Sequence, residues 1–296
     1  MALNRELVGK SYPGTAPWVV AADHVRAYAL ATQSENPRYV DPLVAGGQVA
    51  PPIYGVVVGQ RAVEQLLLDP ELAVDTTQLL HTEQHMRFGE PMRPGEALTY
   101  EAIVVAIGDE RGGENLDVAL RVRRSDGSLA YDSLVRLFIR TPGVKRTGQE
   151  RRADIPGVLK RSLPPQITAS SSPLFEQTLH VADDQSLRYA DASGDYNPIH
   201  RDPALAKAAG LPGIILHGMC TLAMAQNALV DQGGGGDPAL LKALGGSFTR
   251  RVQPGDDLTV RAHAAAESQG VRTIGFEVTK QNGKAVIKDG VAEFAR

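Results

Sequence analysis

The sequence lacks the features that mark secreted, membrane-spanning and nucleic-acid-binding proteins. Its single cysteine, Cys220, excludes an internal disulfide and fits a reducing cytoplasm. Residues 1–14 contain no apolar signal-peptide core, and no apolar run approaches the ~18 residues of a membrane span. Aromatic residues make up only 5% of the chain, which leaves little for stacking nucleic-acid bases. We therefore expect a cytoplasmic globular protein that binds neither membrane nor nucleic acid.

Neither sign of charge is in large excess. The 31 Lys and Arg residues and the 34 Asp and Glu residues leave a formal net charge of −3, so no basic face is expected unless the charges cluster locally. With 43% hydrophobic residues, the composition argues against disorder. At about 150 residues per domain, a chain of 296 residues forms two domains or one large one.

Three pairs of matching segments indicate that the two domains are copies of one unit. The stretch 25–42 matches 187–203, with Asn36-Pro37 on Asn197-Pro198 and Asp41-Pro42 on Asp202-Pro203 at a shift of 161, and 93–99 matches 253–259 at a shift of 160. Between them, each copy has a helix-length apolar segment, over 54–68 and 219–230. Three matches in the same order make an internal duplication the better interpretation.

Each copy follows one coarse pattern. A short polar helix carries the Asn-Pro pair, a longer apolar helix follows, and a run of strands ends the copy. The strands are rich in Val, Ile and Thr, and residues typical of hairpin turns join them at 125–128 and 281–284. Strands joined by hairpins form an antiparallel sheet. The segment 219–230 is apolar on most faces, which predicts a helix buried in the sheet.

The joint between the copies is expected in the basic and proline-rich stretch 141–172. Its basic residues are more typical of a solvated linker than of a phosphate-binding patch. They include Lys145, Arg146, Arg151 and Arg152. We predict an N-terminal domain over 1–145, a linker over 146–172 and a C-terminal domain over 173–296.

The densest group of reactive side chains lies in the second copy. A carboxylate, a carboxamide and an imidazole fall within six residues, at Asp195, Asn197 and His200. Gly194 and Pro198 favour a turn there. Such a turn can direct Asp195 and His200 at one point, as acid–base work on a shared water requires. The alternative is an Asx turn that caps a helix, with His200 incidental.

The same cluster can be compared with the ligand patterns of two kinds of metal site, for calcium and for zinc. A calcium loop that starts at Asp195 needs Gly at its sixth position and Glu at its twelfth, where this chain has His200 and Ala206. A zinc site could use Asp195, His200 and His217, but no helical His-x-x-x-His pair and no Cys pair accompany them. We therefore predict no metal.

A second feature is Gly218, which begins the apolar helix of the second copy. A helix N-terminus presents free N–H groups and a positive dipole end, and glycine lets a ligand approach the backbone closely. That arrangement suits an oxyanion hole. A glycine selected for close helix packing is the alternative. Cys220, in an apolar stretch, is more typical of a small buried filler than of a reactive thiolate.

The stretch 189–200, YADASGDYNPIH, followed by ILHG at 215–218, resembles the signature of the MaoC-like, (R)-specific enoyl-CoA hydratases (hydratase 2). The Gly-Asp-x-Asn-Pro-x-His core is fully present, and 251–256 resembles the strand entry of that family. The first half resembles the degenerate N-terminal dehydratase domain of two-domain members, with Ala50-Pro51-Pro52 in place of Leu216-His217-Gly218. The resemblance implies an α+β double hotdog, two antiparallel sheets each wrapped around a central helix and packed as a pseudo-dimer.

The same resemblance implies reversible hydration of trans-2-enoyl thioesters to (R)-3-hydroxyacyl thioesters, as in fatty acid metabolism. Asp195 and His200 would share one water, which Asn197 would help to position. The Gly218 N–H would polarise the thioester carbonyl, and His217 and Arg251 are expected to bind substrate. No cofactor is expected, because coenzyme A or acyl carrier protein is part of the substrate. A chain with its own pair of hotdogs is expected to be complete alone or to form a homodimer.

The duplication offers an independent check on this chemistry. Carried back by 161 positions, Asp195 falls on Ser34, Asn197 on Asn36 and His200 on Tyr39. The first copy thus keeps the turn and loses both acid–base groups, which favours a chemical role in the second copy and predicts one active site per chain. We also expect the acyl chain to run into space vacated in the first half.

Two other functions stay open. Hotdog folds also support thioester hydrolysis, which a release of free thiol would reveal. A non-catalytic acyl-thioester-binding subunit of a larger complex is the third candidate, and the intact set of Asp195, Asn197 and His200 argues against it.

Overall fold

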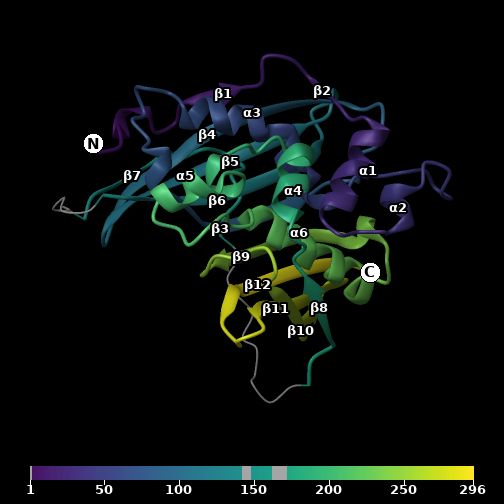
Figure 1. Ribbon diagram of the computed structural model, residues 1–296. Coiled ribbons are helices and arrows are strands. Elements are labelled where there is room, and N and C mark those ends of the chain that lie inside the picture. Colours follow the sequence, from purple (N-terminus) through teal and green to yellow (C-terminus); the bar gives the residue numbers. More distant parts are fainter. Residues whose placement is uncertain (1, 142–147, 162–171) are drawn as a thin grey trace.

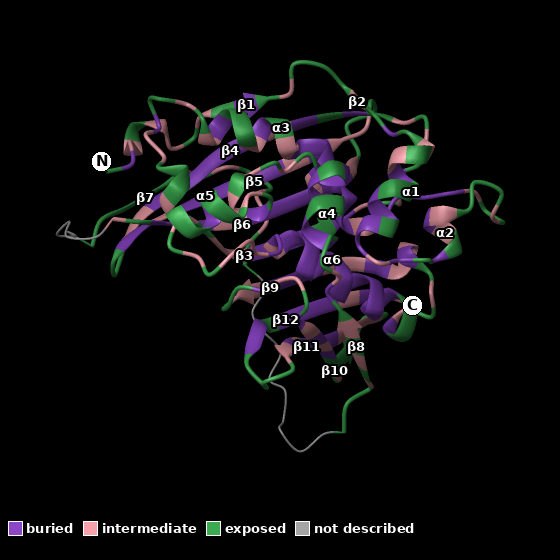
Figure 2. Ribbon diagram, in the orientation of Figure 1, coloured by how far each residue is buried: buried purple, intermediate pink, exposed green. Residues whose placement is uncertain are grey.

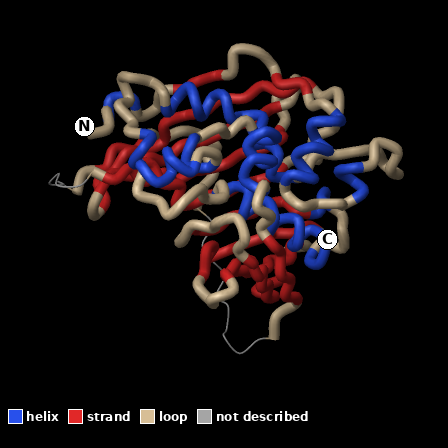
Figure 3. Tube along the Cα trace, in the orientation of Figure 1, coloured by secondary structure: helices blue, strands red, loops and turns tan. Residues whose placement is uncertain are grey.

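The computed structural model describes residues 2–141, 148–161 and 172–296. Within them, 12 strands form one antiparallel sheet, with the helices packed against it (Figures 1 and 3). The strand order is β1-β4-β5-β6-β3-β9-β12-β11-β10-β8, and β2 and β7 both pair with β4. No helix in the described part of the chain is long and apolar enough to cross a membrane.

The two halves contribute similar sets of elements. The strands of the first half are β1 (Ser11–Pro13), β2 (Trp18–Val19), β3 (Leu79–Phe88), β4 (Ala97–Glu110), β5 (Gly113–Arg123), β6 (Leu129–Arg140) and β7 (Glu150–Arg152). Those of the second are β8 (Phe175–His180), β9 (Leu241–Phe248), β10 (Asp257–Ser268), β11 (Val271–Lys280) and β12 (Ala285–Ala295). The α-helices are α1 (Ala22–Ala31), α2 (Pro37–Val40), α3 (Gly55–Leu67), α4 (Gln185–Ser193), α5 (Pro203–Ala208) and α6 (Gly218–Ala228). Short helical turns are η1 (Arg5–Leu7), η2 (Pro52–Tyr54), η3 (Thr76–Gln78), η4 (Pro198–His200), η5 (Leu229–Gly233) and η6 (Pro238–Leu240).

The halves join through one strand pair, β3 with β9. Its register runs from Glu83 opposite Ser247 to Arg87 opposite Ala243, so the sheet continues across the boundary between the copies. Helix α3 packs against β4 and β5 of the first half, and the start of α6 lies beside Phe248 on β9 of the second half. The α+β double-hotdog architecture is therefore confirmed.

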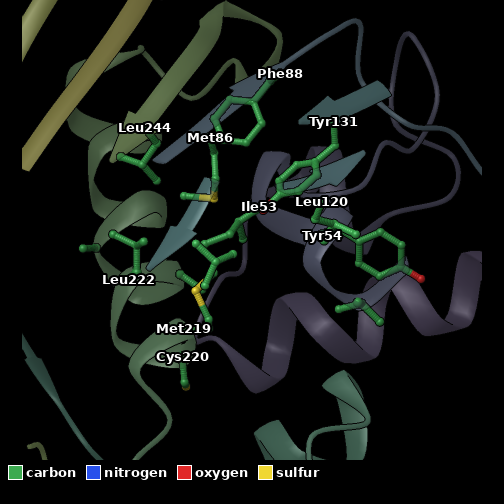
Figure 4. Packing of buried hydrophobic residues seen from close by; sticks show 14 of the residues in the cluster. Ile53, Tyr54, Met86, Phe88, Leu120, Tyr131, Met219, Cys220, Leu222 and Leu244 are labelled. Carbon is green, nitrogen blue, oxygen red and sulfur yellow. The ribbon is translucent and has the colours of Figure 1, made fainter. Parts of the chain in front are cut away.

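The two apolar segments form the central helices α3 and α6, as their hydrophobic patterns predict. In α6, every residue from Met219 to Ala228 is buried, as predicted for a helix that is apolar on most faces (Figure 2). In α3, Val57, Val58 and Leu66 are buried, and full burial of such a side chain stabilises a fold by about 1.5–3 kcal/mol. Ile53, just before α3, belongs to the same packed cluster as Met219 (Figure 4). The two halves therefore share one core.

The described part of the predicted linker, 148–161, packs on the protein. Strand β7 pairs with β4, and Arg152 forms an ion pair with Asp117 at 2.9 Å. Three partly buried side chains, Ile155, Val158 and Leu159, cover a small apolar cluster on the sheet of the first half. Most residues of 148–161, Arg151 and Arg152 among them, are exposed, as a solvated linker requires, yet the segment is held against the sheet of the first half. Lys145 and Arg146 lie outside the described residues, and the domain boundaries stay a prediction.

A buried polar network also connects the halves. The Ile53 N–H donates to Oε1 of Gln226 on α6 at 3.2 Å. Gln226 Nε2 donates to Asn227 Oδ1 at 2.9 Å, and Asn227 Nδ2 donates to the Thr32 carbonyl oxygen at 2.8 Å. Because an unpaired polar group in a core costs more than a pair gains, each member holds the others in place. The network fixes α6 against the first half.

Replacing Gln226 with Leu is expected to lower the free energy of unfolding by about 1–3 kcal/mol, because the buried Ile53 N–H loses its acceptor. Urea unfolding followed by circular dichroism measures the change. The matched control is Gln60→Leu. Gln60 precedes Gln226 by 166 positions, as Pro52 precedes Gly218, but it is only half-buried and has no such bond to the opposite half among the described residues. Equal losses in both variants would contradict this account.

Candidate active site

The reactive cluster of the second half is built on a tight turn after α4. The helix ends at Gly194, whose φ of +77° is a left-handed conformation that glycine adopts without strain. The Asn197 N–H then donates to Asp195 Oδ1 at 3.2 Å, and the Ile199 N–H donates to Asn197 Oδ1 at 3.3 Å. Asn197 therefore caps η4, the short turn that carries His200. The alternative interpretation, a turn that caps a helix, is therefore confirmed for Asn197, whose side-chain oxygen accepts the Ile199 N–H.

The turn brings three of the predicted site residues together. Asp195, His200 and His217 each place one side-chain N or O atom within 4.8 Å of the others. Asp195 is half-buried, whereas His200 and His217 are buried. No hydrogen bond or ion pair joins Asp195 to His200 within the described residues, and the separation suits one bridging water. His200 is thus part of a cluster and not incidental to the turn.

The hydrogen bonding of His200 decides which nitrogen is available. Its Nδ1 lies 2.8 Å from the Ile215 carbonyl oxygen, which can only accept, so Nδ1 carries the proton in the neutral ring. The lone pair is then on Nε2. Burial lowers the pKa of His200, and the Asp195 carboxylate only partly opposes that effect. At neutral pH the ring is therefore uncharged and ready to accept a proton at Nε2.

The geometry does not favour a metal ion in this cluster. The rings of His200 and His217 stack with centroids 3.7 Å apart and planes at 28°. Nearly parallel rings direct their in-plane lone pairs along parallel planes, so they do not converge on one ion. Two of the four ring nitrogens also have protein partners, since His217 Nε2 lies 3.0 Å from the Asp195 carbonyl oxygen and His200 Nδ1 is bonded to Ile215.

Gly218 lies beside this cluster as the first residue of α6, directly after His217. It has no positive φ, and a Cβ added there would meet the Phe248 ring at 3.4 Å, close to ordinary contact. Neither backbone conformation nor packing therefore demands glycine. The half-buried Gly218 N–H has no acceptor within the described residues and lies at a helix N-terminus, where a developing negative charge is stabilised.

Comparisons with known proteins identify relatives of both halves of the chain. A model of the MaoC like domain matches residues 166–285, and a model of the FAS1-like, dehydratase domain region matches 6–127. The 3-hydroxyacyl-thioester dehydratase Y of Mycobacterium tuberculosis is 33% identical over 224 residues, which are 73% of this chain and 72% of that protein. The chain belongs to the MaoC-like dehydratase family.

Other relatives of this MaoC-like chain cover one or both halves. The peroxisomal enoyl-CoA hydratase 2 of Arabidopsis thaliana is 30% identical and covers 74% of this chain and 69% of its own length. A UPF0336 protein of Streptomyces coelicolor is 32% identical over 145 residues, 47% of this chain and 97% of that protein. Among solved structures, a MaoC-like dehydratase from Phytophthora capsici has a TM-score of 0.81 at 23% identity and covers 99% of this chain and 98% of its own. That likeness shows a shared fold.

The first half of this MaoC-like chain keeps the turn but has other side chains at the counterparts of the site residues. Ser34 and Tyr39, in the places of Asp195 and His200, are both buried. Asn36 keeps its capping role and also donates to Asp231 Oδ1 at 3.0 Å. The expectation that the acyl chain runs into space in the first half stays a prediction. One sequence signal was available: proline, which has no N–H, stands at position 52 in the place of Gly218.

Two further residues considered in the sequence, Arg251 and Cys220, are not part of the cluster of Asp195, His200 and His217. Arg251 is exposed, and its neighbour Val252 accepts the Leu216 N–H at 2.8 Å, so this segment runs beside the start of α6. A role for Arg251 in substrate binding stays a prediction. Cys220 is fully buried, and burial raises the pKa of its thiol to about 12, which fits the expected inert filler.

Two side chains that pack beside the cluster had no clear signal in the sequence. Phe248 on β9 packs over Gly218, and His81 of the first half packs against Phe248 with ring centroids 4.8 Å apart. Both lie on the strands at the boundary of the halves, more than 25 residues from the catalytic motif. Their place at the site depends on the β3–β9 pair, which local patterns do not specify.

Proposed function

We propose that this chain catalyses the reversible hydration of trans-2-enoyl thioesters to (R)-3-hydroxyacyl thioesters. The observation that carries the proposal is the pairing of Asp195 with a neutral His200, within 4.8 Å and beside the free Gly218 N–H. The relatives named as dehydratase and hydratase act, by their names, on thioesters of this class. Coenzyme A or acyl carrier protein would be part of the substrate.

The geometry suggests how the reaction proceeds. One water lies between Asp195 and His200, and His200 Nε2 accepts a proton as the water oxygen bonds to the β-carbon. The carbon–carbon double bond breaks, its electrons move towards the thioester carbonyl, and the α-carbon takes up the proton held by the acid–base pair. The Gly218 N–H stabilises the enolate-like oxygen, where charge develops only during the reaction. Atoms balance without any further reactant.

The first half supports the assignment of the oxyanion donor. At the corresponding start of its central helix, the Ile53 N–H binds the amide oxygen of Gln226 at 3.2 Å. Ile53 is the counterpart of Met219, the residue after Gly218, so the chain already contains one carbonyl-type oxygen bound at the start of a central helix. Gln60, the counterpart of Gln226 on α3 of the first half, makes no such bond to the start of α6 among the described residues, which leaves the N–H groups there for a substrate.

The test is a direct assay of the purified chain with crotonyl-CoA and longer trans-2-enoyl-CoAs. We expect loss of the absorbance of the conjugated thioester and, on chiral analysis, formation of the (R)-3-hydroxyacyl product. A parallel thiol assay should detect no free coenzyme A. Release of thiol would identify a thioesterase instead, and an absence of turnover at every chain length would favour a binding subunit.

A further inference from the structure

His217 is a second buried imidazole at the site, and the proposed reaction leaves it without a task. It is 2% exposed, so its contacts are with protein. Burial and the neighbouring His200 lower its pKa to about 3, which keeps it uncharged and makes it unsuited to proton transfer near neutral pH. A substrate contact, the role expected from the sequence, also fits poorly with a ring that is enclosed.

Both polar and apolar contacts of His217 lead to the acid–base pair. Its Nε2 lies 3.0 Å from the Asp195 carbonyl oxygen, so Nε2 is the protonated nitrogen and donates to the backbone of the catalytic carboxylate. Its face stacks on His200 at 3.7 Å between centroids. The remaining nitrogen, Nδ1, is buried and has no partner within the described residues. One hydrogen bond and one stack therefore account for its position.

The opposite side of His217 is anchored in the core. Tyr189 on α4 contacts its ring at 4.9 Å between centroids, and Tyr28 of the first half lies 5.9 Å from Tyr189. Tyr54, in turn, lies 5.5 Å from Tyr28. A row of buried rings thus runs from the first half to His200. Packed aromatic rings hold one orientation well, because each has few torsions and a large contact area.

We propose that His217 is a positioning residue that sets both members of the pair: its face holds the ring of His200, and its Nε2–H holds the backbone of Asp195. This inference rests on the proposed hydration reaction. Small displacements of acid–base groups can cost about 100-fold in rate, so one side chain that fixes two of them affects the reaction without touching substrate. His217 also excludes water from one face of His200.

The charged and titratable groups that face the two imidazoles are few. Asp195 raises the pKa of both rings, Arg201 lowers that of His217, and Tyr189 is a neutral neighbour on α4. Desolvation is the largest influence on His200 and lowers its pKa. Removal of the stacked ring would let water reach His200 and raise its pKa towards the ordinary value. Because activity requires the neutral form, the acid limb of the pH profile would then move to higher pH.

Two matched variants separate the two contacts. His217→Gln keeps a donor for the Asp195 carbonyl and loses the ring, whereas His217→Phe keeps the ring and loses the donor. We expect kcat to fall by about 10- to 100-fold in each, with KM within about twofold of the parent. The acid limb of kcat/KM should move to higher pH in His217→Gln and stay in place in His217→Phe. Circular dichroism confirms that each variant is folded.

Three outcomes would overturn the inference. A rise in KM with unchanged kcat would make His217 a substrate contact, and unchanged kinetics would leave it without a role. The third outcome is an unchanged pKa of His200 in His217→Gln, which can be measured without the reaction. The ¹⁵N shifts of His200 in histidine-labelled protein, assigned with His200→Gln, report this pKa directly. If the parent chain has no hydratase activity, the proposed function fails, and an unchanged His200 titration in His217→Gln still decides against the inference.

Discussion

Replacing Asp195 with Asn is expected to lower the rate of enoyl-CoA hydration by at least about 100-fold, the usual contribution of a positioned acid–base group. The amide cannot exchange a proton with the bridging water. It keeps nearly the same shape and an oxygen that accepts the Asn197 N–H, a bond of 3.2 Å in the parent chain. The turn should therefore survive, and kcat/KM should fall without loss of stability. Steady-state kinetics and urea unfolding measure the two quantities.

The duplicated fold supplies the control for this experiment. Ser34 is the counterpart of Asp195, and its Oγ accepts the Asn36 N–H at 3.4 Å, just as Asp195 accepts that of Asn197. Ser34→Ala removes the same type of turn contact from the first half. Hydration should stay within about twofold of the parent rate if only the second half performs chemistry. A retained rate in Asp195→Asn would contradict the assigned role of the carboxylate.

Replacing Gly218 with Pro is expected to lower kcat by about 100- to 1,000-fold, the typical effect of removing one oxyanion donor. Proline deletes the N–H and leaves the chain direction unchanged. The position accepts it, because proline is common at the first residue of a helix. His217 before it has φ −58° and ψ 135°, the extended conformation that a residue preceding proline prefers. The first half already has Pro52 at this place.

Gly218→Ala is the control, since it keeps the N–H and adds a methyl group 3.4 Å from the Phe248 ring. A loss that both variants share would reflect crowding against Phe248, and the additional loss in Gly218→Pro measures the donor. Equal rates for the two variants would remove Gly218 from the oxyanion hole. The circular dichroism of both should match that of the parent, because α6 stays buried along its length.

Much of the site was predictable because its parts are close in sequence. Gly194, Asp195, Asn197 and His200 form one turn, and the hydrogen bonds that shape it span two residues each. The loss of Asp and His from the first copy was equally visible by alignment. Helix α6 was predictable from its uniform apolarity. In each case a local pattern carries the information, since turn geometry and helix burial depend on neighbours along the chain.

The contacts that complete the site depend on packing between distant segments. Gln226 bonds to Ile53 across 173 positions, and Arg152 of the predicted linker pairs with Asp117 of the first sheet. The stack of His217 on His200 needs the start of α6 and the turn after α4 to meet. Composition and spacing do not predict such pairs. These contacts form only when the sheet continues from β3 to β9, because its register then determines which side chains are buried together. Local patterns thus predicted the acid–base turn and the duplicated hotdog, whereas the packing of the folded core is the basis for proposing that His200 reacts and His217 holds it in place.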